Sequence, residues 1–515
     1  MSILTVTDLN HTYGGREILK NVSFRLLKGE HVGLIGANGE GKSTFMNIIT
    51  NKLMPDEGKI EWAKRVRVGY FDQHSDIDKN KTIKETLQDA FNWLYDIEKE
   101  MNDIYMNIAD VSQDKMDDML NEAGVLGDIL EQHDFYMIDT KVEEIARAMS
   151  LYDFGIETQI GDLSGGQRSK VLLSKLLLQK PDILLLDEPT NYLDIEQIEW
   201  LKRYLQEYEN AFILISHDIS FLNSVINLIW HIDNCELSRY VGDYNEFERL
   251  YQLKQEQIES AYKRQQQEIA KLEDFVARNK ARVATRNMAM SRQKKLDKME
   301  RIELKREKPK PEFNFKQTSA TSKLIFETKD LVIGYDKPLT KKLNLRMERG
   351  DKILITGANG LGKSTLIKTI LGKIDNLGGS IYYGENLKIG YFEQEERQNN
   401  TNTSLEEMWQ EFPNMNQHEV RAALAKCGLT TEHIESKVMV LSGGEQAKVR
   451  LCKIINKETN ILFLDEPTNH LDVYAKDELI RAFKEYKGAI IMISHDLDFV
   501  SELNSKVWKM EDFVL

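Results

Sequence analysis

Short apolar runs recur along the chain, and each has the length of a strand. Four apolar residues precede Asp187, four precede Asp465, and another run covers Ala211 to Ser216. No uncharged apolar stretch approaches the roughly 18 residues that a membrane-spanning helix needs. Runs of this length, bounded by polar residues, are typical of buried strands, so we predict an α/β protein.

A segment near Glu85 to Glu131 follows a helical period instead. It has no proline, and its apolar residues recur three or four positions apart at Leu94, Ile97, Met101, Ile104 and Ile108. This spacing predicts a helical arm. From Glu85 to Asp134 the arm carries 14 acidic and two basic residues. A solvated helical face explains this charge better than contact with nucleic acid, and a protein partner with a basic surface is the alternative.

A second segment with helical spacing runs from about Glu248 to Glu307, without glycine or proline. Its apolar positions are Ile258, Tyr262, Ile269, Leu272, Val276, Val283, Leu296, Met299 and Ile302. The pattern predicts two long antiparallel helices that meet at a tip near Ala284 to Ser291. We expect Pro309 and Pro311 to end the second helix, because proline disrupts helical hydrogen bonding.

The chain contains the same motifs twice in the same order. HVGLIGANGEGKST at His31–Thr44 recurs as KILITGANGLGKST at Lys352–Thr365, and ILLLDEPTNYLD at Ile183–Asp194 recurs as ILFLDEPTNHLD at Ile461–Asp472. Three shorter pairs keep this order: VGYFDQ and IGYFEQ, LSGGQ and LSGGE, and ILISHD and IMISHD. One type of domain is therefore present in two copies.

The spacing between the copies shows where they differ. Lys42 and Gln73 have counterparts 321 residues later, whereas Ser164, Asp187 and His217 have counterparts 278 residues later. The difference gives the first copy 43 extra residues between Gln73 and Ser164, where the predicted arm lies. The predicted organisation is a first domain at 1–248 with its arm at about 85–131, a basic helical pair at 249–322, and a second domain at 323–515.

The protein is acidic as a whole but basic in one stretch. Its 515 residues carry 69 Lys and Arg against 83 Asp and Glu, a formal net charge of −14. Between Phe275 and Lys298 eight basic residues face one acid, for a local charge of +7; they are Arg278, Lys280, Arg282, Arg286, Arg292, Lys294, Lys295 and Lys298. Any RNA contact is expected in this stretch, because phosphates require local positive charge. The alternative is a solvated helix face.

The spacing of three of these arginines makes the prediction more specific. Arg278, Arg282 and Arg286 are four residues apart, so one continuous helix would place them in a single stripe. The three cysteines are scattered without a CxxC pair, which indicates a reducing compartment and no disulfide or zinc framework. The opening MSILTVTDLN has no basic segment followed by an apolar run, so we expect a cytoplasmic protein without a secretory signal.

A GxxxxGK[ST] motif between an apolar run and a helix is a phosphate cradle. Its glycines let backbone N–H groups point at phosphate oxygens, the lysine reaches the β- and γ-phosphates, and the serine ligates Mg²⁺. In the first copy the predicted nucleotide-binding residues are Gly36, Asn38, Gly39, Gly41, Lys42, Ser43 and Thr44. In the second copy they are Gly357, Asn359, Gly360, Gly362, Lys363, Ser364 and Thr365.

Carboxylates follow a buried strand in both copies, at the end where α/β sheets bind ligands. Asp187 and Asp465 are predicted to hold Mg²⁺, and Glu188 and Glu466 to orient the attacking water. Three further pairs are less specific alone but repeat at matching positions. Gln73 and Gln394 are candidate Mg²⁺ ligands, His217 and His495 are candidate γ-phosphate contacts, and Tyr13 and Tyr335 either stack on adenine or are buried core residues.

Together, LSGGQ, the glutamine and histidine motifs and the two phosphate-site motifs resemble ATP-binding cassette domains. The resemblance implies head-to-tail pairing, in which each ATP lies between the phosphate cradle of one copy and the LSGGQ-type motif of the other. Lys42, Ser43, Gln73, Asp187, Glu188 and His217 would then work with Ser442, Gly443 and Gly444. Lys363, Ser364, Gln394, Asp465, Glu466 and His495 would work with Ser164, Gly165 and Gly166.

Two cassettes in one chain, EPTN[HY]LD in both, an arm and a charged helical pair resemble the ABC-F family of translation factors, most like its YbiT-type branch. The resemblance implies a monomeric ATPase that uses ATP and Mg²⁺ and binds near the ribosomal tRNA exit site. The helical pair would reach the P-site tRNA and the peptidyl-transferase region of the large-subunit rRNA. Tyr192 replaces the histidine found at His470, so the two sites are expected to differ.

Two other functions remain as alternatives. Some members of this family protect ribosomes against antibiotics, and their interdomain tips are often longer than this one. An energising subunit of a membrane transporter is the alternative from another class, and it would need partner subunits that cross the membrane.

Overall fold

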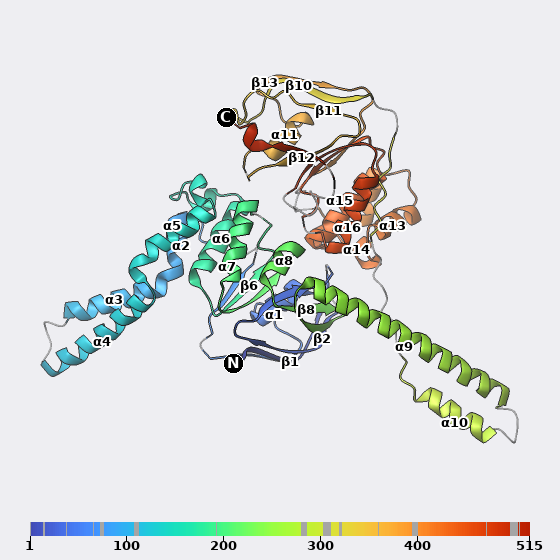
Figure 1. The fold of residues 1–515 in the computed structure, drawn as a ribbon, viewed down its shortest axis with the longest axis horizontal. Helices are drawn as coiled ribbons and strands as arrows, with labels where there is room; N and C mark the ends of the chain where they lie inside the picture. Colours follow the sequence, from blue (N-terminus) through green and yellow to red (C-terminus); the bar gives the residue numbers. More distant parts are fainter. Residues whose placement is uncertain are drawn as a thin grey trace.

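The computed structural model describes most of the chain, in segments separated by short gaps. The described residues are 2–13, 16–37, 39–64, 66–72, 77–107, 113–191, 193–279, 286–301, 311–318, 322–358, 360–393, 400–469, 471–494, 503 and 505–514. They form two α/β domains and two projecting helical pairs (Figure 1). Among these segments, none of the helices combines the length and the hydrophobicity of a membrane-spanning helix.

The first domain contains two sheets. The larger has the order β5-β6-β7-β3-β8-β9 and is parallel except for β9, which pairs antiparallel with β8. The smaller, with the order β2-β1-β4, is antiparallel. The strands are β1 Ser2–Tyr13, β2 Arg16–Leu27, β3 His31–Ile35, β4 Glu57–Trp62, β5 Val68–Phe71, β6 Ile183–Asp187, β7 Ala211–Ile215, β8 Leu228–Asp233 and β9 Glu236–Val241.

The second domain repeats this plan. Its parallel sheet has the order β14-β15-β16-β12-β17, and its antiparallel sheet has the order β11-β10-β13. The strands are β10 Leu324–Val332, β11 Arg346–Glu348, β12 Lys352–Thr356, β13 Gly378–Tyr383, β14 Ile389–Phe392, β15 Ile461–Asp465, β16 Ala489–Ile493 and β17 Lys506–Lys509. The predicted α/β class and the duplication are confirmed.

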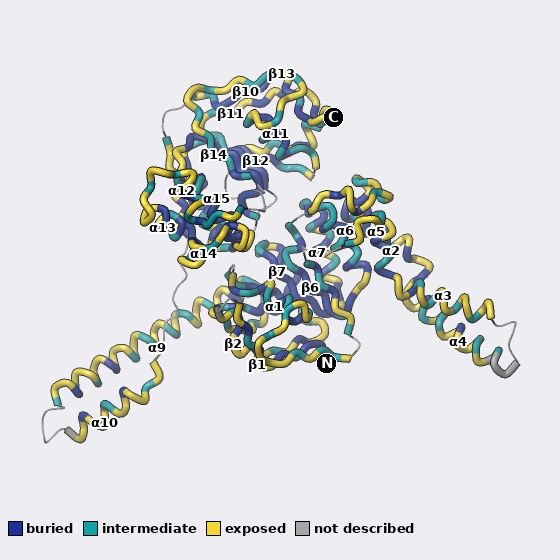
Figure 2. Tube along the Cα trace, turned by 180° about the vertical axis from the view of Figure 1, so that it is seen from behind, coloured by how far each residue is buried: buried dark blue, intermediate teal, exposed yellow. Residues whose placement is uncertain are grey.

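In the first domain helices cover one face of the parallel sheet, and the antiparallel sheet with one helix covers the other, so that the apolar runs are buried on both faces (Figure 2). Along β6, Ile183 and Leu185 face a core shared with β1, β2 and α1, whereas Leu184 and Leu186 face a core shared with α6 and α7. Burial on both faces explains why these strands are continuously apolar. The first-domain helices are α1 Lys42–Ile49, α2 Ile83–Gln88, α5 Ile138–Ala148, α6 Gly165–Gln179, α7 Ile195–Gln206 and α8 Ile219–Val225. The second-domain helices are α11 Lys363–Ile370, α12 Ser404–Glu411, α13 Gln417–Lys426, α14 Thr431–Glu435, α15 Gly443–Asn456 and α16 Val473–Glu485.

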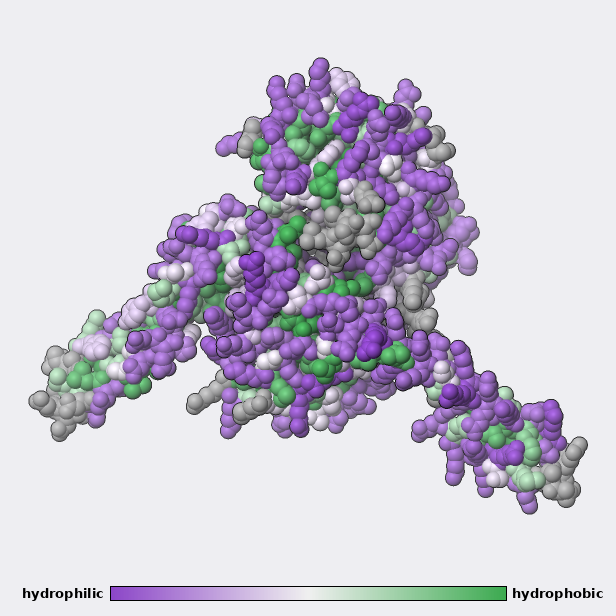
Figure 3. Space-filling view, in the orientation of Figure 1, coloured by the Kyte–Doolittle hydropathy of each residue, from purple (hydrophilic) through white to green (hydrophobic). Residues whose placement is uncertain are grey.

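The extra residues of the first domain form the expected helical arm. It consists of α3 Asn92–Asn107 and α4 Gln113–Gln132, which pack against each other and project from the domain (Figure 1). Leu94 is buried, and Ile97 and Met101 pack partly against the main core of this domain. Apolar groups also remain exposed on the arm (Figure 3). Tyr105, Met106 and Val125 are among its exposed residues. Ile108 lies outside the described residues.

The second projection is the interdomain helical pair, made of α9 Tyr244–Asn279 and α10 Arg286–Asp297. The two helices pack through a small core of Ile269, Val276 and Leu296, with Leu272 and Met299 partly buried beside it. The predicted antiparallel helical pair is therefore confirmed. Its helices are unequal, however, with 36 residues in α9 and 12 in α10.

The details of this pair correct three sequence-based expectations. The tip was predicted at residues 284–291, but Arg286 to Ser291 are helical in α10, where Ala289 is fully buried. The second helix ends at Asp297 rather than at Pro309, because the following backbone turns to pack along α9, where Gln265 Nε2 donates to the Glu300 carbonyl at 2.8 Å. Residues 302–310 lie outside the described segments.

The third correction concerns the arginine stripe. Arg278 lies in the last turn of α9, whereas Arg286 is the first residue of α10. The two residues belong to different helices, so the predicted continuous stripe does not form. Arg282 and Val283, which would have continued the stripe and the apolar seam, lie outside the described residues.

Candidate functional site

Both phosphate cradles occupy the turn between a central strand and a helix. The first lies between β3 and α1, and the second between β12 and α11. The residues just before the helices, Gly41 and Gly362, have φ values of 91° and 90°, a left-handed conformation that glycine adopts without steric cost. A side chain at Gly41 would also collide with Ile18, since an added Cβ would lie 2.3 Å from its Cγ2. The glycine positions are therefore required by the backbone itself.

The two cradle lysines make matching contacts. Lys42 Nζ donates to the carbonyls of Gly36 and Ala37 at 2.7 and 3.2 Å, and Lys363 Nζ donates to those of Gly357 and Ala358 at 2.6 and 3.1 Å. Burial lowers the pKa of both lysines, while the neighbouring acidic residues act in the opposite direction. Each ammonium is thus held inside its loop.

A hydroxyl and a carboxylate meet beside each lysine. Ser43 Oγ donates to Asp187 Oδ2 at 2.9 Å, and Ser364 also hydrogen-bonds Asp465. Burial raises the pKa of both aspartates. Asp465 Oδ1 is buried without a hydrogen-bond partner among the described residues. Hard oxygen ligands in this arrangement fit Mg²⁺, which takes few protein ligands and completes its shell with water and phosphate oxygens.

The glutamates that follow the aspartates have strained backbones. Glu188 and Glu466 have φ values of 49° and 50°, although neither is glycine. Their backbone N–H groups donate to the carbonyls of Ile215 and Ile493 at 2.9 and 3.1 Å, which ties each glutamate to the neighbouring strand. Such strain in a matched pair of residues is typical of functional sites.

Glu188 lies in a buried environment next to His217. Burial, and to a smaller extent Asp187, raises the pKa of Glu188 to about 8, against the effect of Lys42, Lys476 and a hydrogen bond from the His217 backbone. Its Oε1 lies 3.4 Å from His217 Nε2. A carboxyl with a raised pKa beside an imidazole can exchange a proton with a water molecule, as phosphoanhydride hydrolysis requires.

The LSGG motifs form the N-termini of two long helices. Ser164 caps α6 by accepting from the Gln167 N–H, and Ser442 caps α15 by accepting from the Glu445 N–H. Gly165 and Gly166 begin α6, and Gly443 and Gly444 begin α15. Each serine therefore marks a helix end whose free N–H groups and dipole favour an anion.

The structure brings residues of each domain towards the cradle of the other domain. A Cβ added to Gly39 would lie 3.0 Å from Glu445 Oε1. Asp472 contributes to the electrostatic environment of Lys42, and Asp194 contributes to that of Lys363. We call the group around Lys42, Asp187, Glu188 and His217, with Glu445, Asp472 and Lys476 opposite, the first site. The group around Lys363, Asp465 and Glu466, with Asp194 opposite, is the second site.

The two candidate adenine-stacking residues lie on the surface. Tyr13 is 71% exposed and Tyr335 is 62% exposed. The alternative that they are buried core residues is therefore wrong. Both rings are accessible to a planar ligand.

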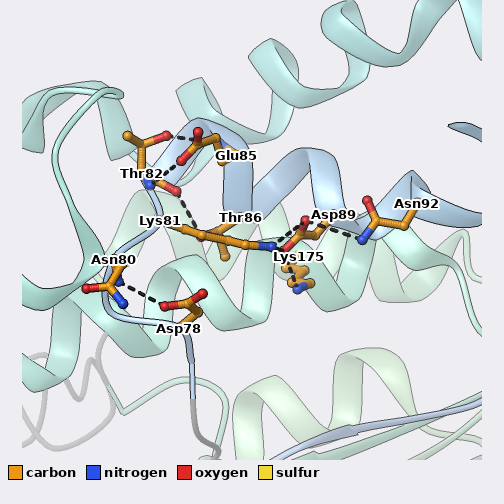
Figure 4. Close-up of polar contacts among 9 residues, drawn as sticks. All are labelled: Asp78, Asn80, Lys81, Thr82, Glu85, Thr86, Asp89, Asn92 and Lys175. Carbon is orange, nitrogen blue, oxygen red and sulfur yellow. Dashed lines mark hydrogen bonds and ion pairs between the residues drawn. The ribbon is translucent and has the colours of Figure 1, made fainter.

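An ion network fixes the segment that leads from β5 towards α6 (Figure 4). Lys81 Nζ donates to both Asp89 carboxylate oxygens at 2.7 and 2.9 Å, and Lys175 of α6 adds a third contact at 3.4 Å. In the second domain the corresponding lysine, Lys453 of α15, is paired with Glu407, which also accepts from Asn400 and Asn402. Each LSGG-type helix is thus tied to the segment that follows the predicted glutamine ligand.

Several predicted site residues cannot be placed. Asn38, Gln73, Lys280, Arg282, Asn359, Gln394 and His495 lie outside the described residues, as do Tyr192 and His470. Thr44 and Thr365 lie in the first turns of α1 and α11. Of the predicted RNA-contact residues, Arg278, Arg292, Lys294, Lys295 and Lys298 are exposed on the interdomain pair.

Three residues near the sites were not predicted from the sequence. Asp194 and Asp472 cap α7 and α16 and approach the opposite lysines, as their positions at the end of the EPTN motifs could have indicated. Lys476 belongs to the second domain, yet its Nζ donates to the His217 carbonyl at 3.2 Å. No repeat could reveal it, because the residue 278 positions earlier is Ile198.

A phosphate cradle, a Mg²⁺-type oxygen pair, a buried glutamate and an LSGG-type helix, each present twice in one chain, define a tandem-cassette ATPase. The family model described as "ABC transporter" matches residues 19–191 and 340–469, and a second model with the same description matches residues 230–315. The matched cassettes are ATP-binding domains with ATPase activity, as predicted.

The chain belongs to the ABC-F family. It is 34% identical to ABC transporter F family member 2 of Arabidopsis thaliana, over 98% of this chain and 76% of the relative. The uncharacterized ABC transporter ATP-binding protein YfmM of Bacillus subtilis is 66% identical, over 100% of this chain and 99% of the relative. The probable ATP-binding protein YbiT of Escherichia coli O157:H7 is 33% identical, over 98% and 95%.

Solved structures share the tandem fold at low sequence identity. A crystal structure titled as the complex of archaeal ribosomal stalk protein aP1 and archaeal ribosome recycling factor aABCE1 has a TM-score of 0.57 and 19% identity. The similarity covers 98% of this chain and 87% of that one. The comparison supports the arrangement of two cassettes in one chain.

Proposed function

We propose that this protein is a ribosome-binding ATPase. Its ATP-bound, closed form binds near the tRNA exit site and influences the P-site tRNA and the peptidyl-transferase centre, and ATP hydrolysis releases it. The observation that carries this proposal is the interdomain pair of α9 and α10, a basic projection that leaves the body between two ATP-dependent domains (Figure 1).

The charge of the outer half of this pair supports contact with RNA. On α10 and just beyond it, Arg292, Lys294, Lys295 and Lys298 are exposed, with Asp297 the one acid among them. Part of this charge is balanced locally, because Arg278 pairs with Asp274 at 2.8 Å and Lys295 with Glu268 at 2.7 Å. The lysines at 294 and 298 are therefore the best candidates for phosphate contacts, which dominate RNA affinity.

Further side chains give the projection a defined shape. The Arg292 guanidinium lies 3.6 Å from the centre of the Phe275 ring, a cation–π contact that joins α10 to α9. Met288 and Met290 are 54% and 47% exposed near the start of α10. Charged side chains held in place and flexible methionines at the far end of a long helical pair suit the recognition of a folded RNA surface.

ATP controls this activity through closure of the two domains. Lys42 and Lys363 would hold the β- and γ-phosphates, while Ser43, Asp187, Ser364 and Asp465 would hold Mg²⁺, which supplies charge neutralisation when bound. Glu188 and Glu466 would orient the attacking water. The helix ends at Ser164 and Ser442 would contact the γ-phosphate from the opposite domain, so cleavage of that phosphate removes a link between the domains.

Sedimentation with ribosomes tests the proposal. Full-length protein carrying Glu188→Gln and Glu466→Gln would be incubated with ribosomes and with membranes, in ATP or ADP. We expect the double variant to pellet with ribosomes in ATP far more than the parent, and not in ADP. Equal pelleting of parent and variant in ATP would contradict the proposal, and pelleting with membranes would support the transporter alternative.

Charge reversal then tests the interdomain contact. Lys294→Glu with Lys298→Glu should weaken ribosome binding and flatten its logarithmic salt dependence, by roughly 0.7 for each lost phosphate contact. Lys254→Glu with Lys263→Glu, in the first 20 residues of α9, provides a matched control that should leave the slope unchanged. The same slope for both pairs would show that α10 does not contact RNA.

A further inference from the structure

The first site receives a lysine from the opposite domain. Lys476 lies in α16 of the second domain, and its Nζ donates to the carbonyl oxygen of His217 in the first domain at 3.2 Å. This is a direct hydrogen bond across the boundary between the two cassettes. It reaches the backbone of the residue that contacts the predicted hydrolytic glutamate.

His217 connects this lysine to Glu188 in two ways. Its backbone N–H donates to the Glu188 carboxylate, and its Nε2 lies 3.4 Å from Glu188 Oε1. The lysine therefore holds the carbonyl of the same residue whose N–H and ring define the position of the carboxylate. A shift of the His217 backbone would move both contacts together.

The position of Lys476 is itself fixed by the LSGG-type helix of its own domain. Lys448 of α15 forms a buried ion pair at 2.8 Å with Asp472, the N-cap of α16. Asp472 also accepts from the Ala475 N–H at 2.9 Å, one residue before Lys476. A chain of polar contacts thus runs from α15 through the start of α16 to His217 and Glu188.

The second site has a different residue at the corresponding place. The residue 278 positions before Lys476 is Ile198, which packs partly against the main core of the first domain and has no amino group. The neighbouring features are retained, because Asp194 caps α7 as Asp472 caps α16. The lysine is therefore a difference between otherwise matching elements.

We infer that Lys476 is a positioning residue that acts across the cassette boundary, aligning His217 and Glu188 for hydrolysis in the first site alone. The inference rests on the proposed assignment of Glu188 and Glu466 as the hydrolytic glutamates. Placement of a reacting group within a fraction of an ångström has large effects on rate, so a contact of this kind acts on turnover rather than on ATP binding.

Variants in which one site is inactive allow the hydrolysis rate of each site to be measured separately. In Glu466→Gln protein only the first site would hydrolyse ATP, and in Glu188→Gln protein only the second. Adding Lys476→Ile to the first background should lower kcat about tenfold, since a hydrogen bond to a charged group contributes about one power of ten. The KM for ATP should stay nearly constant, and Lys476→Arg should restore most of the rate. In the second background Lys476→Ile should change neither constant.

Two further measurements exclude a general folding defect. Hydrogen exchange of the full-length, nucleotide-free protein should be faster in the peptide that covers residues 211–222 for Lys476→Ile, and close to the parent for Lys476→Arg. Lys202→Ile, on the corresponding helix α7, removes a lysine whose ion pair at 3.5 Å is with Glu199 of its own helix. This control should leave both single-site rates and the exchange unchanged.

A loss of kcat on Lys476→Ile in the Glu466→Gln protein, with no loss in the Glu188→Gln protein, supports the inference. Equal losses in both backgrounds, a change in KM alone, or unchanged exchange near His217 would overturn it. The glutamate assignment fails separately, if Glu188→Gln and Glu466→Gln together leave turnover at the parent level.

Discussion

The two proposed ATP sites have the same residue types in their own cassettes but differ in the residues at matching positions of the opposite cassette. Lys42 and Lys363, with their serines and aspartates, make matching contacts. Across the boundary, the first site faces Glu445 and Lys476, whereas the corresponding residues for the second site are Gln167 and Ile198. The copies are thus alike in the predicted phosphate cradles and differ at these positions of the opposite cassette.

Replacing one of the two proposed hydrolytic glutamates at a time should have the largest effect, on the rate of ATP hydrolysis. Glu188→Gln and Glu466→Gln should each reduce hydrolysis at their own site by about 10²–10⁴-fold, because an oriented general base is lost. If Lys476 favours the first site, Glu188→Gln lowers total steady-state turnover more than Glu466→Gln does. Equal residual rates in a phosphate-release assay would show that the two sites are functionally alike.

Loss of the lysine that anchors each LSGG-type helix should have the second-largest effect, on the stability of the protein. Lys453→Met leaves the half-buried Glu407 without its cationic partner, which should cost roughly 1–3 kcal/mol of stability. Lys175→Met should cost less, because Asp89 keeps Lys81. Thermal unfolding of both variants checks the order, and a larger shift for Lys175→Met would contradict it.

The ion pair between Lys453 and Glu407 also predicts that the stability of the protein depends on pH. Burial raises the pKa of Glu407, but hydrogen bonds from Lys453, Asn400 and Asn402 outweigh it, so the net pKa is lowered. The stabilisation is therefore complete above the unfolded pKa of about 4.3 and is lost as the pH falls through the lower folded pKa. The difference in melting temperature between Lys453→Met and the parent should shrink in acid, and a constant difference would contradict this origin.

Replacing the residue that follows each LSGG motif with the residue found in the other copy should have the smallest effect, on the affinity for ATP. Glu445→Gln removes a negative charge from the first site, where Glu445 Oε1 approaches Gly39. ATP should then bind that site more tightly, by about 1 kcal/mol or roughly fivefold in Kd. Gln167→Glu is the matched control and should weaken ATP binding at the second site. Titrations in the single-site backgrounds check both, and a change of the same sign in the two variants would contradict the electrostatic explanation.

The sequence predicted most of what lies within each cassette. Apolar runs before Asp187 and Asp465 identified β6 and β15, and the repeat located both cradles and both LSGG-type helices. These features depend on local spacing, which duplication makes easy to recognise. Tyr13 and Tyr335 could not be decided from spacing, because a core tyrosine and an exposed one occupy the same position in the pattern.

What the sequence missed depends on contacts between distant segments. The end of α10 at Asp297 follows from packing against α9, not from the prolines twelve and more residues later. The +7 stretch overestimated free charge, because Asp274 and Glu268 of α9 pair with Arg278 and Lys295. The contact of Lys476 could not be predicted for the same reason, since only the assembled domains bring it to His217.

The most direct test of the proposed function is a density map of ribosomes bound to the Glu188→Gln, Glu466→Gln protein in ATP. We expect the two cassettes near the tRNA exit site, both proposed ATP sites closed on ATP, and α10 against the P-site tRNA with Lys294 and Lys298 at its phosphates. Density for the protein at another ribosomal site, or α9 and α10 extended into solvent away from tRNA and rRNA, would contradict it.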